Sequence, residues 1–253
     1  IQAAELLRDV LWGSCYAAVV TSATLRALGS FQSLQRETGI PDFAHFMAVA
    51  GAFDYQQAAV IRVPGDAVEG NAVEQHSRDI IDRFDTLVEP RCGTLVLFSS
   101  RRQMEQVYDE LSDDLQKNIL IQGQYSNREM VRLHKERIDQ GRTSVLMGLA
   151  SFAEGVDLPG DYCRHVVIAK LPFAVPDDPL HEALSEWIED RGGNSFFDIA
   201  LPIASLRLIQ ACGRLLRTES DTGTVTILDK RLITKRYGAQ LLNALPPFRR
   251  EVG

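Results

Sequence analysis

Short runs of β-branched and aliphatic residues alternate along this chain with stretches of helical periodicity. Strands joined through helices pair in parallel, so the alternation predicts an α/β fold, a mostly parallel sheet flanked by helices on both faces. The predicted strands are 17–21, 58–63, 93–99, 118–122, 143–147, 165–170 and 223–228. Sites in such sheets usually lie at the carboxyl ends of the strands, so the residues after each strand are the first candidates for function.

Helical periodicity is clearest in two of the intervening stretches. In the first, apolar residues recur at Met104, Val107, Leu111 and Leu115. The second helix, predicted over 180–188, stops at Gly192 and Gly193, a pair suited to a helix C-cap. Because three prolines precede this helix, residues 171–194 are predicted to be a loop-plus-helix embellishment on one domain that spans residues 1–253.

Composition restricts the class of protein. With 253 residues, 45% of them apolar, the chain can bury one substantial core, but no run reaches the roughly 18 apolar residues of a membrane span. The first residues, Ile-Gln-Ala-Ala-Glu, include neither Met nor a signal-peptide pattern, which predicts a fragment of a longer cytoplasmic protein without a membrane partner. Reduced thiols, and not metal or iron–sulfur ligands, are predicted for the dispersed Cys15, Cys92, Cys163 and Cys212.

Charge is unevenly distributed along the chain. The net charge is −7, yet residues 201–253 contain nine Lys and Arg against four Asp and Glu, whereas residues 1–200 contain eighteen against thirty. This balance argues against a protein that coats nucleic acid by bulk attraction, but it permits a local anion-binding face near the carboxyl end. A solvated basic surface would give the same count.

Two hydroxyl-rich segments directly follow predicted strands. Residues 21–25 read Thr-Ser-Ala-Thr-Leu, and residues 99–102 read Ser-Ser-Arg-Arg. Either segment can be an ordinary helix N-cap, a position that Ser and Thr favour. In the second segment, however, two arginines oppose the dipole of the helix that they open, so a bound anion such as phosphate would relieve the conflict.

An acidic loop follows the strand predicted at 143–147. Residues 151–160 read Ser-Phe-Ala-Glu-Gly-Val-Asp-Leu-Pro-Gly, so Glu154 and Asp157 flank Gly155. Carboxylates at a strand end can orient a ribose hydroxyl, a water molecule or an arginine of a partner. An acidic turn that ends at Pro-Gly is the alternative.

The sharpest pattern is Gln-Ala-Cys-Gly-Arg-Leu-Leu-Arg at residues 210–217. On a continuous helix, Arg214 and Arg217 would lie about 40° and about −20° from Gln210 around the axis. Gly213 costs a helix about 1 kcal/mol relative to Ala, which suggests that another group approaches its backbone closely. Paired guanidinium groups suit bidentate phosphate contacts and stabilise charge in phosphoryl transfer; a solvated basic face is the alternative.

These segments, in this order and spacing, resemble the motifs of superfamily 2 helicases of the DinG/XPD branch. Motifs III, IV, V and VI of that family are similar to residues 21–25, 97–111, 148–160 and 210–217, and an accessory motif is similar to residues 121–123. The runs 228–231 and 235–238 also resemble the DinG tail. The resemblance covers nearly the whole chain, and five motifs in register are far more specific than any single one.

The resemblance implies the RecA-like second lobe of an ATP-dependent DNA helicase that moves 5′ to 3′ on single-stranded DNA and unwinds duplexes, in DNA repair or in resolving replication–transcription conflicts. It implies that Arg214 and Arg217 act as arginine fingers at the γ-phosphate and that Gln210 positions the attacking water or reads the phosphate. Contacts with the nucleotide, or its coupling to DNA, are implied for Glu154, Gly155, Asp157 and Gly213. Contacts with single-stranded DNA or a forked duplex are implied for Thr21, Ser22, Thr24, Ser99, Ser100, Arg101, Gln122, Gly123 and Ser151.

Parts of that family's machinery are missing from the sequence. It contains no G-x-x-x-x-G-K-[ST] loop, no Asp-Glu-Ala-His box and no four-cysteine cluster pattern. We therefore expect an absent N-terminal lobe to hold most of the ATP and Mg²⁺, and the 4Fe-4S cluster to belong to the parent protein only. The fragment alone is expected to be inactive, and its parent to work in the cytoplasm at the bacterial nucleoid.

Two other classes compete with this interpretation. A non-catalytic domain that retains the helicase fold could bind nucleic acid or protein, although the residues of the 210–217 motif are intact. A nucleotide-sugar or dinucleotide enzyme would need a G-x-G-x-x-G turn after a first strand, and the sequence lacks one.

Overall fold

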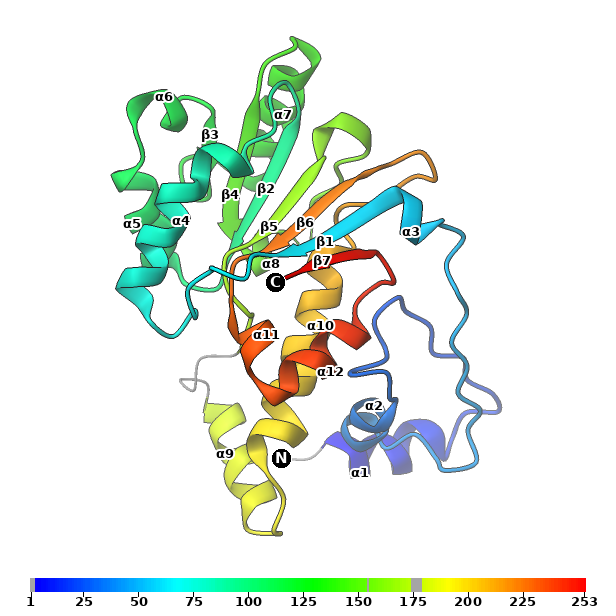
Figure 1. Ribbon diagram of the computed structural model, residues 1–253. Helices are drawn as coiled ribbons and strands as arrows, with labels where there is room; N and C mark the ends of the chain where they lie inside the picture. Colours follow the sequence, from blue (N-terminus) through cyan, green and yellow to red (C-terminus); the bar gives the residue numbers. More distant parts are fainter. Residues whose placement is uncertain (1–2, 154, 174–178) are drawn as a thin grey trace. The chain divides into compact units, whose positions relative to one another are not determined.

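The computed structural model describes residues 3–153, 155–173 and 179–253. They group into two compact units, Ile1–Gly51 with Phe173–Leu206, and Ala52–Pro172 with Arg207–Gly253 (Figure 1). No helix among the described residues is long and apolar enough to cross a bilayer.

The second unit is built around a seven-stranded sheet, and all of its strand pairs are parallel. The order across the sheet is β3-β4-β2-β5-β6-β1-β7. The strands are β1 (Ala59–Val63), β2 (Gly93–Phe98), β3 (Ile119–Ile121), β4 (Ser144–Leu149), β5 (His165–Ile168), β6 (Gly223–Ile227) and β7 (Arg249–Val252). The first six of these confirm predicted strands, and β7 was not predicted.

Helices cover both faces of this sheet, as predicted. They are α3 (Tyr55–Ala58), α4 (Val73–Leu87), α5 (Arg101–Glu110), α6 (Asp113–Gln116), α7 (Asn127–Asp139), α8 (Ala150–Ala153), η2 (Gly160–Tyr162), α11 (Arg231–Thr234) and α12 (Arg236–Ala244). Val96 and Phe98 of β2 pack in one buried cluster with residues of α4 and α5. Gly93 of β2 faces the opposite side of the sheet from Val96 and Phe98. A Cβ added at Gly93 would lie 2.7 Å from Nε2 of His134, a residue of α7, so α7 covers this second face.

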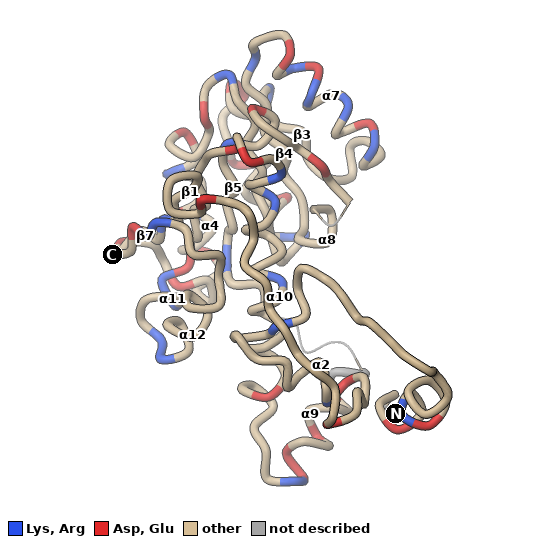
Figure 2. Tube along the Cα trace, turned by 90° about the vertical axis from the view of Figure 1, so that its right-hand side faces the viewer, with Lys and Arg blue, Asp and Glu red and all other residues tan. Residues whose placement is uncertain are grey.

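The outer face of α7 is strongly charged. Basic and acidic residues alternate along it (Figure 2), and the guanidinium of Arg132 pairs with Glu129 at 2.8 Å and with Glu136 at 3.0 Å. Its buried residues, which include Met130 and Ile138, lie on the other side of the helix. The amphipathic pattern therefore explains which side of α7 meets the sheet.

The first unit contains α1 (Ala3–Leu7), η1 (Arg8–Trp12), α2 (Gln32–Thr38), α9 (Pro179–Glu189) and η3 (Phe196–Ala200), and the residues of α10 (Leu201–Cys212) are divided between the units. Helix α9 confirms the helix predicted within 171–194, and Gly192 follows it with a φ of 77°. The strand predicted at 17–21 is wrong. That segment has no strand partner among the described residues, and Val19 is 91% exposed; an extended segment needs a neighbour to satisfy its backbone groups.

Candidate functional site

Several predicted DNA-binding residues gather at one edge of the sheet. Strands β3, β4 and β2 are parallel neighbours, so the segments that follow them share their carboxyl edge. The segment after β2 supplies Ser99 to Arg101, the one after β3 supplies Gln122 and Gly123, and α8 after β4 supplies Ser151. We call these six residues the carboxyl-edge cluster.

Two contacts tie the parts of this cluster together. The side-chain oxygen of Gln122 accepts a hydrogen bond from the backbone N–H of Leu149 at 2.8 Å, which connects the ends of β3 and β4. A guanidinium nitrogen of Arg101 lies 3.5 Å from the position that a Cβ on Gly123 would occupy. The predicted motif IV and accessory motif are therefore adjacent.

The start of α5 combines a cap with an unsatisfied hydroxyl. Ser100 Oγ accepts from the backbone N–H of Gln103 at 3.4 Å, which confirms the N-cap interpretation for Ser100. Arg101 is 52% exposed and pairs with Glu105 at 3.7 Å. Ser99 Oγ, in contrast, is buried with no hydrogen-bond partner in the described structure. Burying such a hydroxyl without a partner is unfavourable.

The two arginines of the 210–217 motif lie outside a helix. Helix α10 ends at Cys212, so the prediction that one helix face carries Arg214 and Arg217 is wrong. The backbone N–H groups of Arg214 and Leu215 donate to the backbone oxygens of Ala211 and Cys212, at 3.1 and 3.2 Å. These bonds span three residues and not four, so they form tight turns that end the helix.

Both guanidinium groups nevertheless converge on one atom. Arg214 Nη1 and Arg217 Nη2 donate to the backbone oxygen of Val156, at 3.2 and 3.0 Å. Arg217 Nε also lies 3.4 Å from a carboxylate oxygen of Asp157, whose side chain is 75% exposed. The acidic loop and the 210–217 motif are therefore in contact. We call Val156, Asp157, Arg214 and Arg217, together with Asp221 described next, the arginine site.

Asp221, which sequence analysis missed, fixes the turn after this motif. Its carboxylate accepts from the backbone N–H groups of Arg217 at 2.6 Å, Thr218 at 2.8 Å and Gly160 at 3.0 Å. Burial by itself raises the pKa of Asp221, but a hydrogen bond from the Thr218 hydroxyl at 2.6 Å and these backbone N–H groups outweigh burial and hold the pKa below its ordinary value. An Asp shortly before a strand, in a Thr-Glu-Ser-Asp-Thr-Gly turn, was the available signal.

The remaining predicted nucleotide-site residues have plainer surroundings. A Cβ on Gly213 would meet only carbonyl oxygens of its own helix, the nearest at 3.3 Å, so the expected close approach by another group is wrong for the described residues. Gly155 faces open space, and Gln210 is half-buried near the end of α10. Glu154 lies outside the described residues.

Thr21, Ser22 and Thr24 belong to the first unit, whereas the carboxyl-edge cluster belongs to the second. Ser22 Oγ accepts from the backbone N–H of Thr24 at 3.3 Å, as in a local turn. Their predicted role at DNA stays a prediction.

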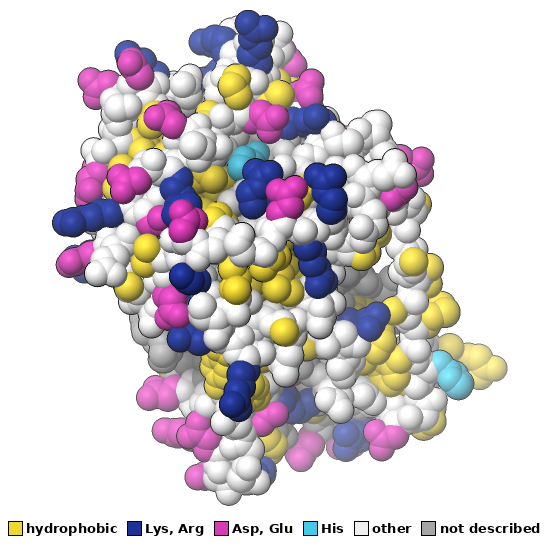
Figure 3. Space-filling model, in the orientation of Figure 1, with side chains coloured by type: hydrophobic (Ala, Val, Ile, Leu, Met, Phe, Trp, Pro, Cys, Tyr) yellow, Lys and Arg dark blue, Asp and Glu magenta, His cyan; other side chains and the backbone are white. Residues whose placement is uncertain are grey.

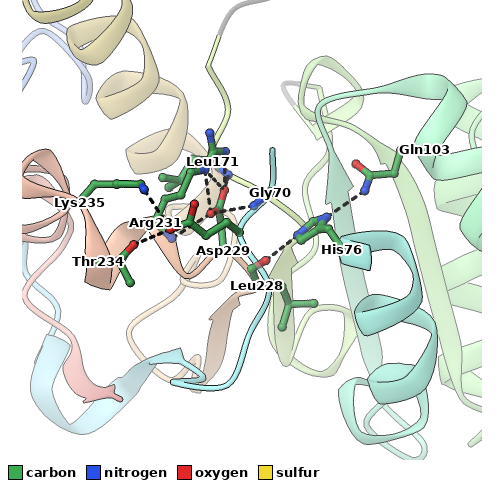
Figure 4. Close-up of polar contacts among 10 residues, drawn as sticks. Gly70, His76, Gln103, Leu171, Leu228, Asp229, Arg231, Thr234 and Lys235 are labelled. Carbon is green, nitrogen blue, oxygen red and sulfur yellow. Dashed lines mark hydrogen bonds and ion pairs between the residues drawn. The ribbon is translucent and has the colours of Figure 1, made fainter. Parts of the chain in front are cut away.

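A buried polar network, also not predicted, lies at the ends of β5 and β6 (Figure 4). The carboxylate of Asp229 has no exposed surface; it pairs with Arg231 at 2.6 Å and accepts from the backbone N–H groups of Leu171 at 3.0 Å and Gly70 at 3.2 Å. Burial alone raises the pKa of Asp229, but Arg231 and the two N–H groups hold it below the ordinary value.

His76 extends this network to α5. Its Nε2 lies 2.7 Å from the backbone oxygen of Leu228, and its Nδ1 lies 2.9 Å from the side-chain nitrogen of Gln103. Because a carbonyl oxygen can only accept, Nε2 carries the proton and Nδ1 accepts from Gln103. Helix α5, which begins with Arg101, is therefore connected to the residue before Asp229. In the described ranges, no three His, Cys, Asp or Glu side chains are placed to hold a metal ion.

Comparison with known proteins gives consistent matches. A family described as the helicase C-terminal domain matches residues 85–248. The ATP-dependent DNA helicase DinG of Photobacterium profundum is 43% identical over 251 residues, which are 97% of this chain and 36% of that protein. DinG of Escherichia coli K12 is 40% identical over 254 residues, 98% of this chain and 35% of that protein. The chain thus spans about a third of the length of these relatives.

Two solved structures share the fold. A structure named XPD helicase aligns with a TM-score of 0.55 at 18% identity, over 78% of this chain and 36% of its own. Xpd4 of S. tokodaii aligns with a TM-score of 0.54 at 15% identity, over 85% and 43%. At these identities the likeness supports the fold, a RecA-like parallel sheet flanked by helices.

Proposed function

Since this chain belongs to the helicase C-terminal domain family, of the DinG/XPD type, we propose that it is the second motor lobe of an ATP-dependent DNA helicase. The observation that carries the proposal is the convergence of Arg214 and Arg217 on the oxygen of Val156. Two guanidinium groups held within reach of one point can together contact the oxygens of a γ-phosphate.

The described contacts with Asp157 and Val156 are weak enough to be exchanged. Asp157 is 75% and Arg217 29% exposed, so their ion pair is screened by water and stabilises by about 1 kcal/mol or less. The oxygen of Val156 is uncharged. A phosphate instead offers several anionic oxygens that match the planar guanidinium fork, so it would compete for both side chains, with Gln210 near the attacking water.

The carboxyl-edge cluster would contact DNA. Hydroxyl groups, amides and an arginine at one sheet edge suit phosphate oxygens, and Arg101 is half-exposed. By resemblance to the family, the substrate is single-stranded DNA or a forked duplex and movement is 5′ to 3′. Thr21, Ser22 and Thr24 would contribute from the first unit.

An N-terminal lobe of a longer protein would complete the motor. It would hold most of the ATP and the Mg²⁺, and the 4Fe-4S cluster would also lie outside this chain. Several side chains of residues 16–49 are strongly exposed although apolar, and Figure 3 shows hydrophobic side chains gathered on this segment at the right. They are Tyr16, Val19, Phe43, Met47 and Val49. Such a patch is typical of a surface that another part of a protein covers. The protein would act in the cytoplasm at the nucleoid.

The test is Arg217→Ala in the full-length helicase. We expect DNA-stimulated ATP hydrolysis to fall by about 10³-fold or more, since the finger stabilises charge in the transition state, while DNA affinity changes little. Arg217→Lys should also fail, because Lys lacks the planar fork. Arg132→Ala, on the charged face of α7, is the matched control and should hydrolyse ATP normally.

Hydrolysis at the parental rate by Arg217→Ala would reject the assigned role. Robust turnover by the 253-residue chain alone, with single-stranded DNA present, would contradict the half-site itself.

A further inference from the structure

Lys170 follows β5 at the same edge of the sheet as the carboxyl-edge cluster. Strand β5 is the neighbour of β2, and Ile168 pairs with Leu97. The ladder continues one bond further, from the N–H of Ala169 to the oxygen of Leu97 at 2.9 Å. Lys170 and Ser99 therefore occupy corresponding positions after two adjacent strands, which are separated by about 4.8 Å.

Both side chains point to the same face. Side chains alternate between the two faces of a strand, so Ser99 points to the same face as Leu97 and Leu95 of β2. For the same reason, Lys170 points to the same face as Ile168 of β5. That face is opposite to the one that packs on α4 and α5. Lys170 and Ser99 are thus neighbouring residues whose side chains leave the same face of the sheet.

Among the described residues, neither the Lys170 ammonium nor the Ser99 hydroxyl has a hydrogen-bond or ion-pair partner. Ser99 Oγ is buried without a hydrogen bond among the described residues. Lys170 is half-buried, and no described carboxylate forms an ion pair with it, since Asp229 pairs with Arg231 and Glu69 with Lys235. Burial lowers the pKa of Lys170, the charge of Arg231 lowers it further, and Asp229 opposes both. An anion at this point would stabilise the ammonium.

The position of Lys170 is held rigidly. Asp229 accepts from the N–H of Leu171, the next residue, at 3.0 Å and from Gly70 at 3.2 Å. A Cβ on Gly70 would lie 2.8 Å from the Cβ of Lys170, so the loop after β1 packs on the stem of this lysine. The base of the side chain is thereby fixed, so binding a ligand orders only its outer part.

We propose that Lys170, together with the hydroxyl of Ser99, binds a backbone phosphate of the polynucleotide. This deepens the proposed function and rests on it: the DNA track extends one strand beyond the carboxyl-edge cluster. From β3 to β5 the edge is about 14 Å wide, three strand spacings, enough for several nucleotides.

A polynucleotide fits this site better than the nucleotide. The arginine site is tied to Gly160 and Asp221, which precede β5 and β6. It therefore lies toward the amino ends of these strands, whereas Lys170 lies beyond the carboxyl end. Strands of four or five residues separate the two ends by about 13–17 Å, so one triphosphate group cannot occupy both.

The test uses the full-length helicase and measures binding of fluorescent oligothymidylate by anisotropy across a range of salt concentrations. Lys170→Ala should weaken binding on the order of tenfold, as expected for one charge-assisted hydrogen bond. It should also reduce the salt slope by about 0.7, the value for one phosphate contact on a single strand. Lys170→Arg should restore both quantities, and Ser99→Ala should lower affinity without changing the slope.

Two controls make the outcomes distinguishable. Lys117, exposed at the C-cap of α6 and paired with Asp114, should tolerate Ala with no change in slope, and Arg101→Ala tests the cluster itself. An unchanged slope in Lys170→Ala beside a reduced slope in Arg101→Ala would overturn the Lys170 site and leave the proposed function standing. Unchanged affinity in both would reject the DNA track.

Two further outcomes decide the remaining cases. A raised KM for ATP in Lys170→Ala with normal DNA affinity would mean that the anion is the nucleotide, which also overturns the proposal. Should the Ala variant fold poorly by circular dichroism, Lys170→Gln, which keeps the stem that packs on Gly70, takes its place with the same expected slope.

Discussion

Replacing Asp229 by Asn should strongly destabilise the sheet-containing unit. Asp229 has no exposed surface, its carboxylate lies 2.6 Å from the Arg231 guanidinium, and it accepts from the N–H groups of Gly70 and Leu171. Asn has the same size but no charge, and an NH₂ donor takes the place of one acceptor oxygen. The variant therefore removes the carboxylate charge that faces Arg231 and leaves at least one buried N–H without an acceptor.

The structure sets the magnitude of this loss. Removing one partner of a buried ion pair costs about 3–5 kcal/mol, and an orphaned buried donor accounts for about 1–3 kcal/mol of such a loss. The side chain of Arg231 is 16% exposed, so water can solvate it in part after the substitution. We therefore expect the free energy of unfolding to fall by about 3 kcal/mol, the lower end of that range.

Urea unfolding of the chain at pH 7, followed by circular dichroism, measures this change as a shift of the midpoint at constant m. The matched control is Glu251→Gln, which breaks the Arg62–Glu251 pair, whose side chains are 51% and 43% exposed; it should cost about 1 kcal/mol or less. A second variant, Asp229→Asn with Arg231→Met, should recover part of the loss, because no uncompensated charge remains. A loss in Asp229→Asn no larger than in Glu251→Gln would refute this account.

Two further predictions concern buried titratable groups. Burial lowers the pKa of His134 and of His165 to about 4, so the unfolded chain binds protons first as the pH falls below about 6.5. The free energy of unfolding should then decrease from pH 6.5 to 4, by up to about 1.4 kcal/mol per pH unit for each histidine. Unfolding at pH 5 without proton uptake would contradict this prediction. Burial raises the pKa of the Cys163 and Cys212 thiols to about 12, so a thiol reagent at pH 8 should modify them only after urea unfolds the chain; prompt reaction of all four thiols in the folded chain would disprove their burial.

Local pattern predicted most of the sheet, and its two failures have clear physical causes. Strand β7 reads Arg-Arg-Glu-Val, so it carries no apolar alternation. It is an edge strand on β1, where charged side chains are common, and cross-strand pairs such as Arg62–Glu251 support it. Residues 17–21 show the opposite case: their β-branched composition favours a strand, but no described strand pairs with them.

For the candidate site, too, the sequence predicted some features and missed others. Residue types and their order identified the motifs, because a motif is a local string. The helical geometry assigned to Arg214 and Arg217 was wrong, since Asp221 and the turns after Cys212 redirect the chain. Their convergence on Val156 joins residues about sixty positions apart, which no local period can reveal.

The sequence by itself determined the α/β class, the positions of six of the seven strands and the presence of the helicase motifs, because each depends on residues within one or two turns of one another. Only the tertiary structure decided the strand order, and with it the placement of Ser99 and Lys170 after adjacent strands and the burial of Asp229 between Gly70 and Leu171. Those arrangements depend on which distant segments share a sheet edge, and packing of the whole core selects that order.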